Sequence, residues 1–355
     1  MTLDNIYASP DSDVLESGQH IPVYMITTRG DLPLPEEVQG YGYNDQYQFG
    51  DISQLKNECP GEIAIFVHGW LNNEEMAKER LDRVKLSLEQ NNYINTSLIG
   101  FSWPSDTDFT PEGWLEAKQI AKDNGPKLAN FISNYINDCK EIHDKDTKVR
   151  LFSHSLGARV ILSSLQNLHE DPIWNNNDYK ITSVHLMGAA VDDEVSMDPI
   201  DLYNNPAYGS GQLGCFPNHY YEENNIKFPY GNAIGEEVID FYNLMNPEDN
   251  VFQFYYPCYE GADNALGING KQMDPEVVQT PNNYIDLNIR DEIKDIYDAD
   301  ADGQEDLGLC NAFNFCFVDI GDNHAGYMGF RNISNSNLLE YDGAINRVVD
   351  HWSTQ

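Results

Sequence analysis

The sequence predicts an α/β fold in which helices cover both faces of a mainly parallel sheet. Short continuous apolar runs, such as residues 63–67 and 149–152, alternate along the chain with amphipathic stretches of helical length. A continuous apolar run suits a strand buried on both faces, and the alternation implies right-handed crossovers between parallel strands. With 355 residues, of which 41% are hydrophobic and 12% aromatic, the chain can bury one large core. This composition argues against global disorder.

The individual elements can be placed in order along the chain. Apolar residues on one helical face at about 74–89 predict a helix, for which Asn72 or Asn73 is available as N-cap. Further helices are expected at about 111–139, with a break near Gly125-Pro126, and at 157–168 and 338–352. Strands are expected at residues 21–28, 63–67, 97–103, 149–152, 181–187, 238–245 and 315–320.

The chain is expected to form a single domain, residues 19–355, behind a loose polar tail at residues 1–18. Two stretches interrupt the alternation, at about 195–236 and 256–312, and both are rich in Asn, Tyr, Gly and Pro. In open α/β sheets, lids and substrate loops lie above the strand ends. We therefore expect both stretches to be insertions at that edge, the first of them a lid.

The charge balance is strongly acidic. Asp and Glu number 58 against 21 Lys and Arg, which gives a formal net charge of -37. Such a surface repels nucleic acid and anionic membranes, so neither is expected as a partner. Self-repulsion weakens the compact state in dilute buffer, and molar salt screens it by reducing the Debye length to roughly 3 Å. Because the excess runs along the whole chain, it favours a protein built for a salt-rich cytoplasm, as in halophilic archaea, over an ordinary acidic protein.

The six cysteines include no C-x-x-C pair, which argues against a zinc site or a thioredoxin-like motif. They are Cys59, Cys139, Cys215, Cys258, Cys310 and Cys316. The first residues lack the basic and apolar regions of a signal peptide, and no apolar run reaches the length of a membrane span. We therefore expect a soluble, cytoplasmic protein with mostly reduced thiols, in which Cys310 with Cys316 is the only local pair worth a disulfide test.

The segment VRLFSHSLGARV predicts a nucleophile elbow, a tight turn that holds a serine between a strand and a helix. The strand and helix backbones nearly touch at such a turn, so the positions two before and two after the nucleophile must be small. These positions are Ser153 and Gly157, so the motif is S-x-S-x-G rather than G-x-S-x-G. Ser155 is the expected nucleophile.

The segment FVHGW predicts a loop that stabilises an oxyanion. Acyl transfer generates an oxyanion, and each preorganised backbone N–H donor that binds it contributes on the order of 10²–10³ in rate. One donor is expected to be the N–H of Leu156, directly after the nucleophile. The other is expected from Gly69-Trp70, with Trp70 as the donor residue. We expect His68 to shape this loop and not to act as a base.

These segments resemble the lipase-like branch of the α/β-hydrolase superfamily. His-Gly-Trp follows one expected strand, FSWPS at residues 101–105 follows the next, and the elbow follows the third. The order and spacing cover residues 63–168, and the later strands extend the resemblance over most of the chain. The resemblance implies an α/β-hydrolase fold and a triad in the order Ser, acid, His. It implies an esterase- or lipase-like enzyme that forms an acyl-enzyme intermediate on Ser155.

The resemblance leaves two candidates for the triad acid. Asp249, in FYNLMNPEDNVF, follows a strand at the place where this fold usually carries its acid, and the Asn-x-x-Asp-x-Val form is similar to the acid loop of hydrolases of this branch. Asp192 follows the preceding strand, a position that some lipases of the pancreatic type use. Asp249 is preferred because the common order of the fold favours it.

The base is expected to be His324, in DIGDNHAGYMGF, which follows the last expected strand. Tyr327 completes a His-x-x-Tyr pattern that is similar to related sequences. In the implied mechanism, His324 takes the proton of Ser155 and delivers it to the leaving group, while Asp249 orients the imidazole.

A separate acidic segment predicts a structural Ca²⁺ site. Side-chain oxygens at alternate positions, followed by a glycine, can wrap a Ca²⁺ ion. The EF-hand position for a bidentate Glu is Leu309, so the segment is more similar to the shorter D-x-D-x-D-G-x-x-D loops. An acidic stretch on a salt-adapted surface is an equal alternative. The expected ligands are Asp298, Asp300, Asp302, Gln304 and Asp306.

The function that these features favour is hydrolysis of a lipid or small-molecule carboxylic ester, without a cofactor for catalysis. An acyltransferase, thioesterase or amidase would use the same triad. A catalytically silent protein that binds a partner through its two insertions is the alternative from another class. Ser155, His324 and an acid in the expected order favour the enzyme. The oligomeric state is not predicted.

Overall fold

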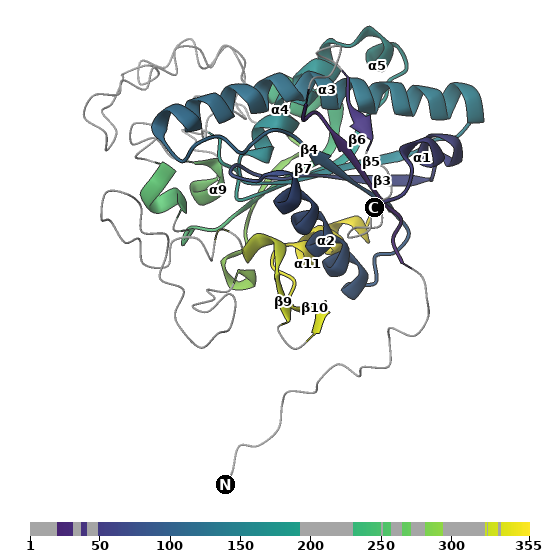
Figure 1. Cartoon of the computed structure of the whole chain (residues 1–355). Coiled ribbons are helices and arrows are strands. Elements are labelled where there is room, and N and C mark those ends of the chain that lie inside the picture. The colour runs from purple at the N-terminus through teal and green to yellow at the C-terminus, as the bar shows by residue number, and fades with distance from the viewer. Residues whose placement is uncertain are drawn as a thin grey trace.

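The computed structural model describes residues 20–30, 37–40, 49–191, 230–249, 251–256, 265–270, 281–293, 324, 326–332 and 335–355. A sheet of eight strands runs through the middle of this part of the chain (Figure 1). The strands are β1 (Val23–Thr27), β2 (Gln39–Gly40), β3 (Glu62–Val67), β4 (Ser97–Ser102), β5 (Lys148–His154), β6 (Ile181–Met187), β7 (Val238–Met245) and β8 (Tyr284–Asn288).

The strand order is β2-β1-β4-β3-β5-β6-β7-β8. Within this sheet only the short β2 pairs antiparallel with its neighbour, and the other described pairings are parallel. This confirms the expected mainly parallel sheet. The expected strands at 21–28, 63–67, 97–103, 149–152, 181–187 and 238–245 are confirmed to within a few residues, and the one at 315–320 lies outside the described residues.

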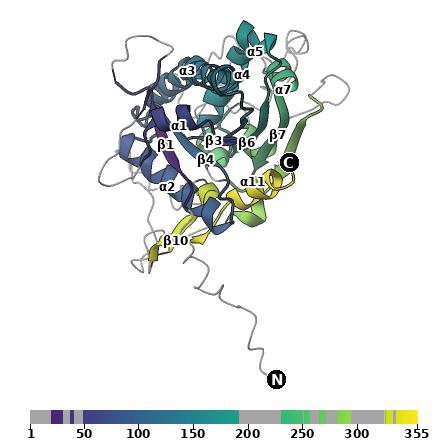
Figure 2. The same cartoon turned by 90° about the vertical axis from the view of Figure 1, so that its right-hand side faces the viewer.

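Helices cover both faces of the sheet, and each face has its own hydrophobic core (Figure 2). The upper layer in Figure 1 contains α1 (Ile52–Glu58), α3 (Pro111–His143), α4 (Gly157–Glu170) and α5 (Pro172–Asn176), and α7 (Gly231–Glu237), labelled in Figure 2, packs against α4. The lower layer consists of α2 (Glu74–Gln90) and α11 (Ile345–Trp352). Among the helices of the described ranges, none is both long enough and apolar enough to cross a membrane.

Strand β3 shows how the sequence specifies this layered arrangement. Ile63, Ile65 and Val67 pack into the core of the upper layer, while Ala64 and Phe66 pack into the core of the lower layer. Successive side chains of a strand point to opposite faces, so a run without polar residues has to be covered on both sides. Full burial of each large aliphatic side chain contributes about 1.5–3 kcal/mol.

Helix α2 begins where the sequence predicts. The side chain of Asn73, the N-cap, accepts a hydrogen bond from the N–H of Met76 at 2.9 Å. This bond satisfies one of the N–H groups that the first turn of a helix leaves without a partner. The helix therefore starts immediately after the loop that follows β3.

The expected break of α3 near Gly125-Pro126 is wrong, because α3 continues through both residues for 33 residues. Pro126 has no N–H for the carbonyl of Lys122, but the hydroxyl of Ser163 in α4 donates a hydrogen bond to that carbonyl at 2.7 Å. A Cβ atom on Gly125 would lie 2.3 Å from the Ser163 oxygen, so the glycine permits this close approach. The neighbouring helix thus compensates for the proline.

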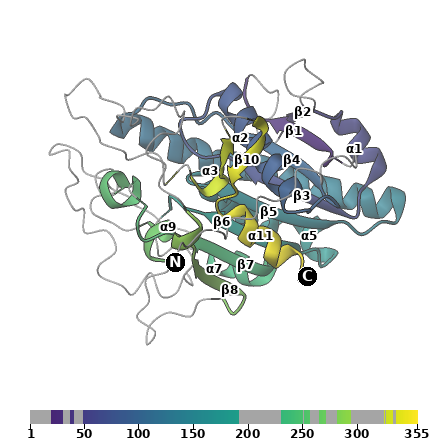
Figure 3. The ribbon, with the colours of Figure 1, turned by 90° about the horizontal axis from the view of Figure 1, so that it is seen from below.

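The expected helix at 338–352 is correct only in its second half. Residues Asn335–Tyr341 form strand β10, which pairs antiparallel with β9 (Phe330–Asn332). This hairpin lies beside α2 (Figure 3), where Gln90 exchanges side-chain hydrogen bonds with the backbone N–H and carbonyl of Leu339. Gly343 lies between the strand and the helix. A glycine is required there, because φ is +60° and a Cβ atom would meet the Gly326 carbonyl oxygen at 2.2 Å.

The expected insertion at 256–312 is not entirely an insertion above the strand ends. Strand β8 lies within it and pairs parallel with β7, so this segment supplies the end strand of the sheet that the described residues form. Its run Tyr-Ile-Asp-Leu-Asn is short and contains two polar residues, so the sequence gives only a weak strand signal there. The remaining short elements of the described chain are the turns η2 (Val251–Tyr255), α9 (Leu266–Asn269), η3 (Arg290–Glu292) and η4 (Gly326–Met328).

The expectation of mostly reduced thiols is wrong for one pair. Cys59 and Cys139 form a disulfide across a sequence separation of 80 residues. Cys59 is the C-cap of α1 and Cys139 lies in the last turns of α3, so packing of the two helix ends brings them together. The proposed local pair Cys310 and Cys316, the tail at 1–18 and most of the expected lid at 195–236 lie outside the described residues.

Candidate active site

The chain places its candidate catalytic segments at a switch point of the sheet. After β3 the chain crosses to β4 on one side, and β5 then returns to the opposite side of β3. In open α/β sheets ligands bind in the crevice at such a point, outside the carboxyl ends of the strands. His68-Gly69-Trp70 directly follows β3, and Ser155 directly follows the neighbouring β5. The predicted oxyanion loop and the predicted elbow are therefore adjacent.

Ser155 adopts the backbone conformation of a nucleophile elbow. Its φ is +54°, a left-handed value that is uncommon for a residue other than glycine. A Cβ atom on Gly157 would lie 2.4 Å from the Val67 carbonyl oxygen and 2.6 Å from that of His68. The small residue two positions after the serine is therefore required, as the sequence indicates. Ser153, at the other small position, is fully buried.

Asp249 and His324 are hydrogen-bonded to each other although 75 residues separate them. Nδ1 of His324 lies 2.7 Å from Oδ2 of Asp249. The other carboxylate oxygen accepts from the N–H groups of Val251 at 3.0 Å and Phe252 at 3.3 Å. Because the carboxylate accepts at Nδ1, the neutral ring carries its proton there and leaves Nε2 unprotonated, the form that a general base needs.

The base candidate lies against the elbow through His154, the residue before Ser155. Nε2 of His154 donates to the carbonyl of His324 at 2.8 Å, and the two ring centroids are 4.6 Å apart. His154 is buried, and this desolvation, followed by the charge of His324, lowers its pKa well below 6.5. A neutral ring with its proton on Nε2 fits this contact. The sequence alone does not identify His154 as a link.

The two predicted donor residues also lie beside Ser155. A Cβ atom on Gly69 would lie 2.8 Å from Cβ of Ser155, so the Gly69-Trp70 backbone approaches the serine very closely. Leu156 follows Ser155 at the start of α4, where backbone N–H groups point out of the helix. The structure thus brings together the backbone of both predicted donors at one end of the sheet.

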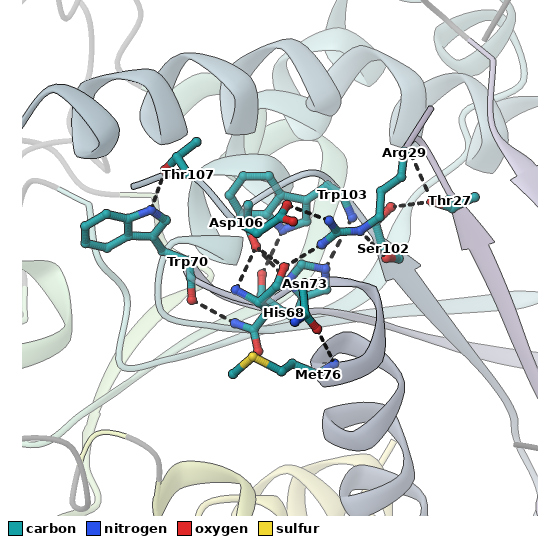
Figure 4. A network of polar contacts seen from close by, with 12 residues as sticks. Thr27, Arg29, His68, Trp70, Asn73, Met76, Ser102, Trp103, Asp106 and Thr107 are labelled. Carbon is teal, nitrogen blue, oxygen red and sulfur yellow. Dashed lines mark hydrogen bonds and ion pairs between the residues drawn. The ribbon is translucent and has the colours of Figure 1, made fainter. Parts of the chain in front are cut away.

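His68 is held in a single neutral form within the loop after β3 (Figure 4). Its Nδ1 lies 2.9 Å from the Gly69 carbonyl oxygen, and its Nε2 accepts from the N–H of Trp103 at 3.2 Å. Burial lowers the pKa of His68 from 6.5 to about 3 and outweighs the bond to Gly69, which raises it, while the charge of Arg29 adds a smaller lowering. These contacts agree with the expected loop-shaping role of His68.

Arg29, which lies shortly after β1, forms hydrogen bonds with both the loop after β3 and the loop after β4. Its guanidinium donates to the Ser102 hydroxyl at 2.9 Å, to the Asp106 carboxylate at 2.7 Å and to the Asn72 carbonyl at 2.6 Å (Figure 4). Sequence reasoning does not single out Arg29, since a lone arginine after a strand carries no pattern. Only the parallel pairing of β1 with β4 brings it to the loops after β3 and β4.

Aromatic side chains extend away from the His324 ring in a continuous series. Phe252 packs edge-on against His324 with centroids 4.8 Å apart, and Tyr256 contacts Phe252 at 5.8 Å. Tyr256 also contacts Trp114 at 6.2 Å, and Trp114 contacts Trp70 at 5.0 Å. The environment of the candidate site is therefore largely apolar on this side.

Tyr327, the tyrosine of the His-x-x-Tyr pattern, is fully buried beside the candidate acid Asp249. Burial, and then the negative charge of Asp249, raise its pKa well above 10. Gly188, at φ +53°, leaves room for the ring, because a Cβ atom there would lie 2.8 Å from it. Tyr327 therefore serves as neutral packing next to Asp249.

The alternative acid Asp192 and the expected Ca²⁺ ligands at 298–306 lie outside the described residues. In the ranges that the structure describes, one other group could hold a metal ion: His169, Glu236 and Glu237 converge within 4.8 Å. Glu237 already accepts from the Trp174 indole at 2.9 Å and lies 3.7 Å from the Lys180 ammonium. Its charge is thus compensated without an ion.

Residues 45–213 match the family described as "Alpha/beta hydrolase of unknown function (DUF900)". The matched segment contains the loop after β3 and the elbow. A search of curated proteins finds no match to the chain.

Three solved structures are similar at low identity. Phospholipase PlaB from Legionella pneumophila, in complex with thio-NAD, is 13% identical with a TM-score of 0.31, over 55% of this chain and 39% of PlaB. A structure from the metagenome-derived lipolytic enzymes LipS and LipT is 10% identical with a TM-score of 0.26, over 64% and 83%. A mutant of the type II thioesterase YbtT, from the yersiniabactin biosynthetic pathway, is 11% identical with a TM-score of 0.27, over 64% and 85%.

This chain spans 39% of the length of PlaB, and likenesses of this size carry no argument about activity. The strand order, by contrast, comes from the structure of this chain and not from its likeness to other proteins. The mainly parallel eight-stranded sheet with helices on both faces, together with the family match, shows that this chain has the α/β-hydrolase fold.

Proposed function

We propose that this protein is a serine hydrolase that cleaves carboxylic esters through an acyl-enzyme intermediate on Ser155. The observation that carries the proposal is the combination of Ser155, at φ +54° on the elbow, with a buried Asp249–His324 hydrogen bond of 2.7 Å. His154 links the two parts, because it precedes Ser155 and donates to the His324 carbonyl. A serine in a left-handed conformation, next in sequence to a residue that contacts a carboxylate-oriented imidazole, supports nucleophilic catalysis.

In the first step, Oγ of Ser155 attacks the ester carbonyl carbon while its proton moves to Nε2 of His324. The carbonyl π electrons move to oxygen and form an oxyanion, which the N–H groups of Leu156 and Trp70 stabilise. The intermediate collapses, the C–O bond to the alcohol breaks, and His324 delivers the proton to the leaving alkoxide. Water then repeats the sequence on the acyl-enzyme, which releases the acid and restores Ser155. Asp249 stays ionised throughout and stabilises the imidazolium.

The aromatic series from Phe252 to Trp70 supports an apolar acyl or alkyl group as part of the substrate. Phe109, which contacts Trp70 with centroids 5.5 Å apart, is 44% exposed. Such surface favours binding of apolar carbon chains, and a few well-placed polar groups fix their orientation. An acyltransferase or thioesterase with the same triad is the alternative within the enzyme class, and a silent binding protein is the alternative outside it.

The test is covalent labelling with a fluorophosphonate, which reacts with an activated serine without the need to guess a substrate. We expect labelling of the wild-type protein and none of Ser155→Ala, together with hydrolysis of short and long p-nitrophenyl esters in molar KCl. Ser133→Ala, which removes a buried hydroxyl of α3, serves as a control and should label normally. Full labelling or full activity in Ser155→Ala would exclude the proposed nucleophile.

A structural Ca²⁺ ion on the loop from Asp298 to Asp306 is a further proposal, which rests on the sequence pattern alone. Asp302 would then bind the ion beside the glycine that permits the turn. A chelator should lower the melting temperature, and Asp302→Asn should abolish the effect. An unchanged melting temperature in the chelator would remove the proposal.

A further inference from the structure

We propose that His68 and Asn72 are positioning residues that aim the N–H of Trp70 at the oxyanion. The inference rests on the proposed hydrolase function and assigns the parts of the chain that preorganise one of its two donors. A preorganised donor is effective because it does not have to rotate into place during the reaction. The contacts that fix this donor are formed by side chains of the same loop and of the loop after β4.

Hydrogen bonds to the Gly69 carbonyl fix the orientation of the peptide that carries the Trp70 N–H. Nδ1 of His68 donates to this carbonyl at 2.9 Å and Nδ2 of Asn72 donates to it at 3.0 Å. The carbonyl of Gly69 and the N–H of Trp70 belong to one planar trans peptide, so they point in opposite directions. Two donors that fix the carbonyl therefore fix the direction of the N–H. They also polarise the peptide, which strengthens its N–H as a donor.

This peptide lies where a donor is needed. Gly69 approaches Ser155 so closely that a Cβ atom on it would lie 2.8 Å from Cβ of Ser155 and 3.2 Å from the His154 carbonyl oxygen. Gly69, at the start of this peptide, is thus packed directly against the serine that would carry the tetrahedral carbon. A small rotation of this peptide would move the donor from the oxyanion.

Only one form of His68 satisfies its contacts. The Gly69 carbonyl accepts at Nδ1, which therefore carries the proton, and the Trp103 N–H donates to Nε2, which therefore carries none. The ring is stacked on the Trp103 indole with centroids 5.6 Å apart, and that indole donates to the His68 carbonyl at 2.8 Å (Figure 4). The Nδ1–H of His68 is thus a fixed hydrogen-bond donor to the Gly69 carbonyl, and the proposed mechanism does not use this ring for proton transfer.

The side chain of Asn72 acts on the loop independently of its backbone. Nδ2 donates to the carbonyls of Gly69 and, at 2.8 Å, Trp70. The backbone carbonyl of Asn72 accepts from Arg29 at 2.6 Å and from the Ser105 hydroxyl at 3.0 Å, and neither bond uses the side chain. Removal of the Asn72 side chain should therefore release the Gly69-Trp70 peptide without unfolding the loop.

The first experiment compares Asn72→Ala with Asn124→Ala in the full-length protein. Asn124 is a matched control, because it is also buried and its Nδ2 donates to the Ile120 carbonyl inside α3, away from the site. We expect Asn72→Ala to lower kcat for a p-nitrophenyl ester about 10- to 100-fold with KM changed less than about twofold, since loss of a whole oxyanion donor costs about 10²–10³. Asn124→Ala should keep both constants.

The second experiment uses His68, with rescue by a conservative change. Nδ2 of an asparagine can donate from nearly the same place as Nδ1 of the histidine, so His68→Asn should retain much more kcat than His68→Ala. Binding of an alkyl boronic acid, which forms a tetrahedral adduct on the serine, should weaken in parallel with kcat in Asn72→Ala and His68→Ala. Ground-state KM should stay close to that of the wild type.

The outcomes separate this inference from the proposed function. Wild-type activity with an undiminished kcat and boronate affinity in Asn72→Ala would overturn the positioning role alone. Equal losses in His68→Asn and His68→Ala, or losses in kcat that merely follow a lower melting temperature, would also overturn it. A wild-type protein that neither hydrolyses esters nor reacts with a fluorophosphonate would remove both the proposed function and this inference.

Discussion

Oδ2 of Asp249, in the loop after β7, and Nδ1 of His324, 75 residues further along the chain, lie 2.7 Å apart. The carboxylate is fully buried, and its other oxygen is held by two backbone N–H groups. A buried carboxylate that is so well coordinated can orient an imidazole without moving itself. Substitution of each candidate acid, Asp249 or Asp192, should therefore have a different effect on catalysis.

We expect Asp249→Asn to reduce kcat about 10³- to 10⁴-fold, because an amide favours the wrong tautomer of the imidazole. Asp192→Asn should leave kcat within a few fold of the wild type. The measurement is steady-state ester hydrolysis, with circular dichroism to check that both variants fold. A larger loss in Asp192→Asn would reverse the assignment of the acid.

The hydrogen bond from Ser163 to the Lys122 carbonyl compensates for Pro126 in the middle of α3. Ser163→Ala should therefore lower the free energy of unfolding by about 1–2 kcal/mol, since a partly buried carbonyl loses the partner that α4 supplies. In a Pro126→Ala background the new N–H can bond to Lys122, so the same change should cost much less. A double-mutant cycle by urea unfolding measures the difference, and equal costs in both backgrounds would contradict the explanation.

The disulfide between Cys59 and Cys139 closes a loop of 80 residues between the ends of two helices. Its removal, by Cys59→Ser with Cys139→Ser or by a reductant, should lower the free energy of unfolding by about 2–4 kcal/mol. Denaturant unfolding with and without reductant measures this effect. A reductant should lower the stability of the double variant less than that of the wild type. Identical stability of the wild type in both conditions would show that the bond contributes nothing in solution.

Buried histidines should make the protein less stable as the pH falls below about 6.5. Burial lowers the pKa of His68 to about 3 and those of His154 and His185 well below 6.5. Each ring binds a proton in the unfolded chain before it does so in the folded protein, so its stabilising contribution is complete above 6.5 and declines with falling pH.

Each such ring should add a slope of about 1.4 kcal/mol per pH unit between pH 6.5 and 5, where carboxylates are still ionised. Urea unfolding across this range is the measurement. His185→Gln, which removes one of these rings away from the candidate site, should have a shallower dependence. A free energy of unfolding that is constant from pH 7 to 5 would be inconsistent with neutral buried histidines.

The net charge of -37 should make stability depend strongly on salt. KCl reduces the Debye length from about 10 Å at 0.1 M to about 3 Å at 1 M, so the mutual repulsion of surface carboxylates is screened. We expect the melting temperature to rise steeply with KCl, and a neutral osmolyte at equal osmolality to give a smaller rise. A melting temperature that does not respond to KCl would favour an ordinary acidic protein.

The segments that the sequence predicts best are those with a local physical cause. The apolar run at β3 must be covered on both faces, and Asn73 caps the first turn of α2 regardless of what packs on that helix. Gly157, two residues after Ser155, is small because the tight turn between strand and helix brings its backbone against that of β3. The fold and the candidate nucleophile could therefore be inferred without coordinates.

The features that sequence reasoning missed depend on partners far away in the chain. Pro126 predicts a break, but Ser163 on another helix removes its cost. Residues 335–341 have apolar positions compatible with a helix, but pairing with β9 makes them a strand. Arg29 and His154 act through contacts with loops that no local pattern connects to them.

The sequence by itself determined the parallel α/β layout and the elbow around Ser155, because strand burial and tight-turn sterics act between residues that are close in the chain. Only the tertiary structure decided that Asp249 is hydrogen-bonded to His324, that His154 contacts His324, and that Cys59 is bonded to Cys139. The order of strands in the sheet and the packing of helix ends set these relationships. They bring together groups that are far apart along the chain and that no local sequence pattern connects.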